Sequence, residues 1–372
     1  MIRVLQILTD SNIGGAGRLL VNYLHNFDTS AFEMLVVLPK GAELIPLVEA
    51  EGYPVRQIEN GRDRSFDMGA VGELKTIIRE WKPDIVHCHS SFSGKLAAWL
   101  CRVPGRFYTR HCAFPQPKKL TTFPGKQING FVNNTLSTHI VAVAQAAMDD
   151  LTATGVDPKK ITVIINGVEP MRTIPEEEKT ALRASLGIGE TDFVCGISAR
   201  LEDYKGHTYL LQAAAKLKAG HPRLRYLIIG GGSMEETLKA EADQLGITDI
   251  VRFTGFVYDV APFYNIMHLS VNCSIGTETS CLALSEGYSL GIPAAASDFG
   301  GNPYMVTDHW NGFLVPQRNP DALAEKIAMI ADDPVLYEKL RKGAAESYEK
   351  KFTAAAMTRQ MEALYHQAVK KA

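Results

Sequence analysis

Three features that would place this chain in a membrane or outside the cell are missing from its sequence. No apolar run approaches the roughly 18 to 20 residues that a membrane-spanning helix needs. The opening MIRVLQILTDSNIGG lacks the basic segment and the small-residue cleavage site of a signal peptide. The six cysteines include no C-x-x-C pair, and in a chain without a signal peptide we expect them to be reduced and mostly buried thiols. We therefore expect a cytoplasmic protein.

Acidic residues are also missing from the whole interval between Asp84 and Asp149. This acid-free interval contains seven basic residues, namely Lys95, Arg102, Arg106, Arg110, Lys118, Lys119 and Lys126. Aromatic residues alternate with them, namely Phe107, Tyr108, Phe114, Phe123 and Phe131. One interpretation is a solvated basic face, and the other is a surface for an anionic membrane or an acceptor that carries phosphate. No nucleic-acid-binding motif accompanies the interval, so we expect no nucleic-acid partner.

The length of 372 residues favours two domains, and apolar segments alternate with helical patterns in both halves. Strands are predicted at 2–8, 33–38, 54–58, 84–88, 105–110, 139–143 and 161–165, and again near 192–198, 224–232, 250–253, 267–272, 293–296 and 312–315. A proline-containing linker, NGVEPMRTIPEEEK, separates the two sets. The alternation predicts an α/β protein with two doubly wound domains facing across a cleft, and ligands at the carboxyl ends of the strands.

A glycine-rich turn, GGAG at 14–17, follows the first strand. Gly14 and Gly15 allow the backbone to approach a phosphate closely, and the following helix supplies free N–H groups. A dinucleotide fingerprint would need a third glycine where Leu20 stands, so an NAD site is not expected. A purely structural tight turn is the remaining alternative.

Histidines and basic residues stand at other predicted strand ends. In DIVHCHSS, strand alternation puts His87 and His89 on one face, and His111 ends the next strand. Three histidines could in principle bind a metal, but no carboxylate accompanies them, so we favour hydrogen bonding to a polar ligand. In ARLEDYKG, Arg200 and Lys205 lie in one loop before a helix, which suits a diphosphate. Solvated loop charges are the alternative.

The stretch GTETSCLALSEGYSLGIP places Glu278 just before an apolar helix and Glu286 inside it. The backbone N–H groups of Cys281, Leu282 and Ala283 at the helix start can receive a phosphate. The two carboxylates can accept hydrogen bonds from hydroxyl groups on either side of that phosphate. A ligand with hydroxyl-rich rings on both sides of a diphosphate is a nucleotide sugar, although two glutamates can also be helix caps or ion-pair partners.

Taken in order, these motifs resemble the retaining family 4 glycosyltransferases, the group 1 glycosyl transferases with the GT-B fold. The resemblance spans essentially the whole chain. It includes the Gly-Gly turn, DIVHCH, NGV at 166–168, ARLEDYKG, VRFTGFVYDV at 251–260, E-x(7)-E at Glu278 and Glu286, GIPAAASDFGG and NGFLV. One departure is the pair Ser280-Cys281, where the family usually has Phe-Gly, and this puts the local sugar pocket in doubt.

The resemblance implies a role for each matching position. Arg200 and Lys205 would neutralise the donor diphosphate, with Gly15 near the same phosphates. Glu278 would hold hydroxyls of the donor sugar, and Glu286 those of the ribose. Phe256 and Val257 would flank the base, and His111 would contact the transferred sugar. The acceptor side would include His87, His89, Arg110, Lys118 and Lys119 in a domain of residues 1–170 completed by 354–372, and the donor would bind a domain of residues 171–353.

The expected activity is therefore a retaining transfer of a hexose, with front-side substitution and no metal or other cofactor. A UDP-sugar is the first choice of donor and GDP-mannose the second. The expected acceptor is a hydroxyl of a glycan or lipid-linked glycan of the cell envelope, used by an enzyme that docks reversibly on the inner membrane face. Two alternatives are a nucleotide-sugar 2-epimerase and a non-enzymatic nucleotide-sugar-binding protein. The E-x(7)-E motif combined with Arg200 and Lys205 favours the transferase.

Overall fold

The computed structural model describes residues 1–113 and 116–370. The chain divides into two compact units, and each is described here by itself. The N-terminal unit comprises residues 1–168 together with the final helix, and the C-terminal unit comprises Glu169–Thr353. The predicted boundary at residue 170 lies close to this division. None of the helices in the described part of the chain combines the length and the apolarity needed to span a bilayer.

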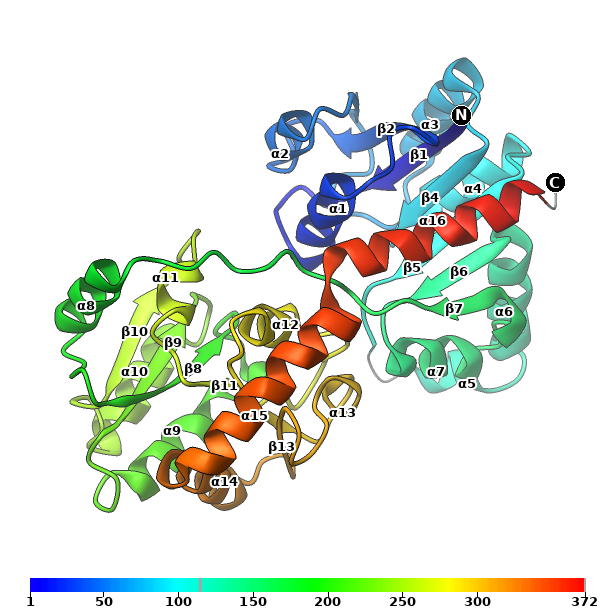
Figure 1. Cartoon of the computed structure of the whole chain (residues 1–372). Helices are drawn as coiled ribbons and strands as arrows, with labels where there is room; N and C mark the ends of the chain where they lie inside the picture. The colour runs from blue at the N-terminus through cyan, green and yellow to red at the C-terminus, as the bar shows by residue number, and fades with distance from the viewer. Residues whose placement is uncertain (114–115, 371–372) are drawn as a thin grey trace. The chain divides into compact units, whose positions relative to one another are not determined.

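The N-terminal unit is built on a parallel sheet whose strand order is β3-β2-β1-β4-β5-β6-β7 (Figure 1). The strands are β1 (Ile2–Leu8), β2 (Phe32–Pro39), β3 (Val55–Ile58), β4 (Ile85–His89), β5 (Gly105–Arg110), β6 (His139–Ala142) and β7 (Ile161–Val163). All neighbouring pairs are parallel. Strands buried on both faces are nearly continuous in apolar residues, as β1 and β2 are here.

Helices cover both faces of this sheet. They are α1 (Gly15–His25), α2 (Ile45–Ala50), α3 (Met68–Trp81), α4 (Phe92–Leu100), α5 (Lys118–Thr121), α6 (Gly125–Leu136), α7 (Gln145–Ala153), the short η1 (Pro158–Lys160) and α16 (Ala354–Lys370). One core contains side chains of α1, α2 and α16, and the opposite core contains side chains of α3, α4 and α7. Side-chain caps fix two of the helix starts, because Asp67 accepts from the N–H of Ala70 and Ser91 from that of Gly94.

The C-terminal unit repeats the architecture with a parallel sheet of order β10-β9-β8-β11-β12-β13. Its strands are β8 (Phe193–Ser198), β9 (Leu224–Ile229), β10 (Val251–Gly255), β11 (Leu269–Asn272), β12 (Ala294–Ser297) and β13 (Gly312–Val315). Its helices are α8 (Glu176–Ser185), η2 (Asp203–Lys205), α9 (His207–Leu217), α10 (Glu235–Gln244), α11 (Ala261–Tyr264), α12 (Leu282–Ser289), α13 (Asn302–Met305), α14 (Pro320–Asp332), α15 (Pro334–Ser347) and η3 (Tyr348–Phe352).

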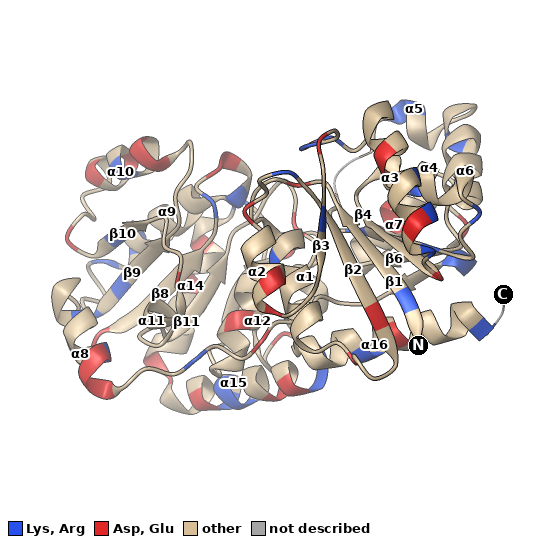
Figure 2. Cartoon of the chain, turned by 90° about the horizontal axis from the view of Figure 1, so that it is seen from above, with Lys and Arg blue, Asp and Glu red and all other residues tan. Residues whose placement is uncertain are grey.

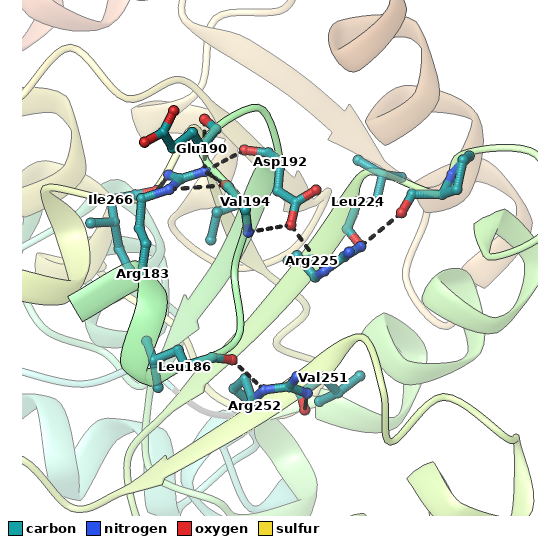
Figure 3. A network of polar contacts seen from close by, with 12 residues as sticks. Arg183, Leu186, Glu190, Asp192, Val194, Leu224, Arg225, Val251, Arg252 and Ile266 are labelled. Atoms are coloured by element: carbon teal, nitrogen blue, oxygen red, sulfur yellow. Dashed lines mark hydrogen bonds and ion pairs between the residues drawn. The ribbon is translucent and has the colours of Figure 1, made fainter. Parts of the chain in front are cut away.

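A polar network at the start of β8 fastens α8 to this sheet (Figure 3). Arg183 on α8 donates to the carbonyls of Gly189 and Asp192 at 2.7 and 2.8 Å. The Asp192 carboxylate forms an ion pair with Arg225 at 3.1 Å, and both side chains are largely buried. These contacts lie at the amino ends of the strands, opposite the edge where ligands bind in doubly wound sheets. We therefore assign the network to structure.

In both sheets the strand order reverses beside the first strand of the unit. The reversal lies between β1 and β4 in the N-terminal unit and between β8 and β11 in the C-terminal unit. At such a switch point the loops after the two strands run in opposite directions and leave room for a ligand. Several predicted site residues lie near these switch points. Gly14 and Gly15 follow β1, and His87 and His89 lie at the end of β4. Arg200 and Lys205 follow β8, and Glu278 follows β11.

Candidate active site

The loops after β8 and β11 pack tightly against each other in the C-terminal unit. Gly206 joins η2 to α9 with a φ of +68°, a conformation that favours glycine. A Cβ atom at this position would lie 2.2 Å from the carbonyl oxygen of Cys273, which follows β11. A larger residue would push the two loops apart, so this glycine holds Lys205 close to the β11 loop.

Lys205 and Glu278 form a buried ion pair across these two loops. The distance between Lys205 Nζ and Glu278 Oε2 is 2.9 Å. The side chains are 19% and 7% exposed, respectively. Burial opposes ionisation of Glu278, but the Lys205 ammonium and two further hydrogen bonds outweigh burial and lower the pKa of that carboxyl. At Lys205 burial is likewise outweighed by the Glu278 charge, which raises the pKa of the ammonium. Both groups are therefore charged at neutral pH.

Neutral side chains that sequence reasoning missed hold Glu278 in place. Glu278 Oε2 also accepts from Asn272 Nδ2 at 3.0 Å and from Ser274 Oγ at 2.8 Å. Asn302 supports this arrangement by donating to the carbonyl of Ser297, whose own hydroxyl donates to the carbonyl of Ser274. The sequence contained a signal for them, because polar residues interrupt the apolar end of β11 in SVNCS. Buried polar residues at a strand end need partners, and here they form one network.

The N-terminus of α12 lies next to the ion pair in the sequence. The N–H of Cys281 donates to Met305 Sδ at 3.0 Å, so this predicted phosphate donor already has a partner. The N–H groups of Leu282 and Ala283 have no acceptor within the described residues. The hydroxyl of Ser280 is buried and also lacks a partner within that range. The N–H groups of Leu282 and Ala283 thus remain available to a ligand at this helix end.

Arg200 and Glu286 are less buried than Glu278, and each contacts a tyrosine hydroxyl. Arg200 is exposed, and its Nη2 donates to the hydroxyl of Tyr204 at 2.5 Å. The Tyr204 ring centroid also lies 5.8 Å from Lys205 Nζ, so one aromatic ring contacts both basic residues. Glu286, on the second turn of α12, accepts from the hydroxyl of Tyr264 at 3.4 Å.

The predicted base-flanking residues follow β10. Phe256 is 74% exposed, whereas Val257 packs against the core beside α8 and α11. A Cβ atom on Gly231, which follows β9, would lie 3.4 Å from Phe256. The exposed Phe256 ring therefore stands at the ends of β9 and β10, on the side of β8 away from β11.

Three stacked histidines, His87, His89 and His111, lie at the carboxyl ends of β4 and β5. We call them the histidine ladder. The rings of His87 and His89 stack with centroids 4.5 Å apart, and those of His89 and His111 with centroids 5.1 Å apart. His89 Nδ1 lies 2.9 Å from His111 Nε2, and its Nε2 lies 2.9 Å from Gln6 Oε1. His87 lies 2.6 Å from both the Tyr365 hydroxyl and the Thr109 hydroxyl. The predicted common face of His87 and His89 is thus seen in the structure.

These histidines are neutral at physiological pH. Burial is the main cause that lowers the pKa of His87 to about 3 and that of His111 to about 4. The pKa of His89 also lies well below its ordinary value, through burial and the two neighbouring histidines. No group of three or more His, Cys, Asp or Glu side chains in residues 1–113 and 116–370 has the geometry of a metal site. The ladder therefore offers neutral hydrogen-bonding groups.

The other predicted residues of the N-terminal unit lie at the same edge or near it. Gly14 caps α1 without a side-chain bond, and a Cβ on Gly15 would meet nothing within 4 Å. The space beside Gly15 is therefore open, and a ligand could approach the backbone there. Arg110 ends β5 and is partly buried, whereas Lys118 and Lys119 on α5 are exposed. Phe114 lies outside the described residues.

Comparisons with known proteins identify the family of this chain. Residues 13–172 match the model of Glycosyltransferase Family 4, and residues 178–347 match that of Glycosyl transferases group 1. A putative glycosyltransferase of Bacillus subtilis, EpsD, is 30% identical over 319 residues, which cover 82% of this chain and 81% of EpsD. The chain belongs to the group 1 glycosyltransferases.

Other relatives of this glycosyltransferase extend the comparison. An Escherichia coli enzyme described as UDP-Gal:alpha-D-GlcNAc-diphosphoundecaprenol alpha-1,3-galactosyltransferase is 28% identical over 279 residues, covering 73% of this chain and 72% of that enzyme. The crystal structure of a Rickettsia africae glycosyltransferase gives a TM-score of 0.85 at 21% identity, covering 100% of this chain and 99% of that one. Anabaena HepE in complex with UDP gives 0.83 at 20% identity, covering 99% and 100%. The fold is GT-B, as predicted.

Proposed function

We propose that this glycosyltransferase moves a hexose from a UDP-sugar to a hydroxyl of a glycan or lipid-linked acceptor, with retention of the anomeric configuration. The observation that carries the proposal is the buried Lys205–Glu278 pair beside the unpaired N–H groups of Leu282 and Ala283. It combines a fixed cation, free backbone donors and a fixed hydroxyl acceptor within one pair of loops. These groups suit the diphosphate and the hydroxyls of a nucleoside diphosphate sugar.

In the proposed reaction the bond between the anomeric carbon and the diphosphate oxygen breaks while the acceptor oxygen bonds to the same face of that carbon. The acceptor hydroxyl gives its proton to the departing phosphate oxygen. Lys205, Arg200 and the start of α12 stabilise the charge that develops on the diphosphate. Because Lys205, Asn272 and Ser274 all reach Oε2 of Glu278, its Oε1 is left to accept from the sugar hydroxyls. No bound metal is required in this scheme.

UDP is favoured as the nucleotide because two related proteins are named with it. HepE has been crystallised with UDP and with UDP-glucose, and the Escherichia coli relative is named as using UDP-Gal. GDP-mannose remains the second choice.

Binding of UDP-glucose, UDP-galactose, GDP-mannose and ADP-glucose should first be compared by thermal shift, because a ligand stabilises the fold that binds it. The donor that stabilises most is then incubated with and without candidate acceptors, and the product is examined by NMR. An α-linked product from an α-linked donor supports the proposal. An inverted product contradicts retention, an epimerised donor indicates an epimerase, and binding without donor hydrolysis or transfer indicates a binding protein.

We further propose that the acceptor is reached at the inner face of a membrane. Three large apolar side chains around α6 are exposed, namely Phe123, Ile128 and Phe131, which are 82%, 61% and 73% exposed. Basic residues occur on α5 and α6 beside them (Figure 2). Apolar side chains inserted between anionic headgroups, with about 1 kcal/mol per basic residue, would give a salt-sensitive attachment.

The test of this attachment is co-sedimentation with vesicles of anionic or neutral lipid at low and high salt. Wild type should bind anionic vesicles at low salt, and Lys118→Glu/Lys119→Glu/Lys126→Glu should not. Phe123→Ser/Phe131→Ser separates the apolar contribution, because its binding should weaken at every salt concentration. If wild type ignores anionic vesicles at low salt, the membrane part of the proposal is wrong.

A further inference from the structure

A cavity lies within the N-terminal unit beside β5, the strand that leads to His111. Its volume is about 220 Å³, whereas a single water needs roughly 10 to 15 Å³. Side chains of β5, α4, α5, α6 and α7 line it together with Ser65 and Gln116. We call it the Lys95 pocket, after the lysine of α4 that lines it.

Lys95 is an unusual residue to find in such a place. It is only 3% exposed, and its Nζ donates to Asn133 Oδ1 at 2.5 Å. The ammonium also lies 4.3 Å from the centroid of the Tyr108 ring. In the described part of the chain, no carboxylate lies within ion-pairing distance of it. A buried cation without a counter-charge is costly, and lysine is almost never fully buried unless it is paired.

The charges around the pocket do not compensate Lys95. Arg110 lines it too, and its guanidinium contacts the Tyr108 hydroxyl. Asp150 is the one carboxylate among the lining residues, and it accepts from Gln116 Nε2 at 3.4 Å. Two cations thus face one anion, and burial together with the charge of Arg110 lowers the pKa of Lys95 to about 8. At neutral pH the Lys95 ammonium therefore stays charged, although burial and Arg110 both favour its neutral form.

A bound oxyanion would resolve this imbalance. It would supply the missing counter-charge for Lys95. It could also accept from the second amide hydrogen of Asn129, whose Nδ2 otherwise donates to the Thr154 carbonyl at 2.8 Å. Charge-assisted hydrogen bonds of this kind are about twice as strong as neutral ones. Arg110 also connects the pocket to the candidate active site, since it immediately precedes His111 in the chain.

We propose that the Lys95 pocket binds an oxyanion group, a phosphate or a carboxylate, that the acceptor substrate carries. The proposal rests on the glycosyl-transfer function proposed above and adds the chemical class of the acceptor. Neutral acceptors would leave Lys95 uncompensated, so the enzyme should prefer an acceptor that is anionic near the hydroxyl it presents.

The first experiment observes Lys95 directly. Lysine labelled with ¹³C at Cε is incorporated, the Lys95 signal is assigned with Lys95→Met, and its titration is followed by NMR with inorganic phosphate, acetate or chloride. Phosphate or acetate should raise the pH at which Lys95 titrates, and the anion that acts at the lower concentration identifies the preferred group. A Lys95 titration that neither anion moves beyond the effect of chloride would overturn the proposal.

Variants then test whether phosphate binds because the charge of Lys95 has no counter-charge in the protein. Lys95→Met removes the cation, and Asn133→Asp supplies an isosteric carboxylate where Lys95 already donates, so it should fold well. Both should weaken phosphate binding, measured by NMR titration, at least tenfold, which corresponds to about 1.4 kcal/mol. Asp150→Asn should strengthen it, and Lys159→Met, which removes an exposed lysine, should leave it unchanged. Equal phosphate affinity in wild type and Asn133→Asp would contradict the proposal.

The last comparison separates this inference from the proposed function. In Lys95→Met, hydrolysis of UDP-glucose without acceptor should match wild type, while the KM for a phosphorylated acceptor rises at least tenfold. If wild type binds phosphate through Lys95 but transfers no sugar, the proposed function fails and the anion pocket remains. If Lys95→Met transfers sugar with an unchanged KM for the acceptor, the anion does not belong to the acceptor and the inference fails.

Discussion

The two units bury polar groups at the same edge of the same kind of sheet, but they do so in opposite ways. The C-terminal unit keeps a charged pair, Lys205 and Glu278, and each charge outweighs the effect of burial on the other. The N-terminal unit keeps a ladder of histidines whose charges burial has removed. A fixed charged pair suits a ligand whose charge changes during the reaction, whereas neutral rings suit hydroxyl groups that must be positioned.

Removing one member of the charged pair should have the largest effect. Lys205→Ala should reduce turnover by about 10³-fold, near the upper limit for loss of one donor to a developing oxyanion. It should also destabilise the C-terminal unit by about 3 to 5 kcal/mol, because Glu278 would remain buried without its cation. Steady-state kinetics and urea unfolding measure the two effects. The double variant Lys205→Met/Glu278→Gln should regain stability without activity, and Lys339→Ala, at an exposed site, is the control.

Arg200→Ala should reduce turnover less, by about 10²-fold, and should leave stability unchanged. Arg200 is exposed and contacts Tyr204 rather than a buried carboxylate, so nothing is left uncompensated when it is removed. Kinetics with saturating acceptor and thermal melting of the same preparation provide the measurement. Arg223→Ala, another exposed arginine of this unit, should behave as wild type. Near-normal turnover in folded Arg200→Ala would remove Arg200 from the diphosphate site.

The pH dependence of stability should distinguish the neutral ladder from the charged pair. The pKa of His87 is about 3 in the folded chain and about 6.5 when unfolded. The contribution of neutral His87 to the unfolding free energy is therefore complete above about pH 6.5 and is lost as the pH falls toward 3. The contribution of ionised Glu278 is lost only below about pH 4.5. His87→Gln should reduce the pH slope of the unfolding free energy between pH 4 and 6 by about 1.4 kcal/mol per pH unit.

Urea unfolding at several pH values measures this slope, and the exposed His309→Gln provides the control. Burial also lowers the pKa of His111 to about 4 and that of His89 well below its ordinary value. His207 and His268 of the C-terminal unit likewise have pKa values lowered to about 4, mainly by burial. Part of the slope should therefore remain in His87→Gln. An unchanged slope in His87→Gln would mean that the ladder does not resist protonation.

The smallest expected effect is that of a chelator. Activity should survive EDTA, because Lys205, Arg200 and the start of α12 supply the positive charge that a divalent ion would supply in other transferases. Initial rates are compared before and after dialysis against EDTA. Loss of activity that Mg²⁺ or Mn²⁺ restores would show that these groups are insufficient.

The sequence predicted strands such as β1 and β9 because most of their residues are apolar and buried. It also placed Lys205 and Glu278 at strand ends, since the alternation of strands and helices gives the direction of each strand. It could not reveal that Asn272 and Ser274 anchor Glu278, or that Met305 occupies the N–H of Cys281. Those contacts join loops that are distant in the sequence, and their geometry depends on the register of the whole sheet.

The final helix α16 returns to the N-terminal unit, where Tyr365 completes the histidine ladder and Met357 and Met361 enter the core. The C-terminal unit is therefore an insertion in the N-terminal unit, joined to it at both ends. During synthesis on the ribosome, residues 169–353 emerge before the last segment of the earlier unit exists. We expect the inserted unit to reach its native state first, while the unit that was begun first remains open along one face of its sheet. Quality control in the cell would then act chiefly on the face that α16 has yet to cover.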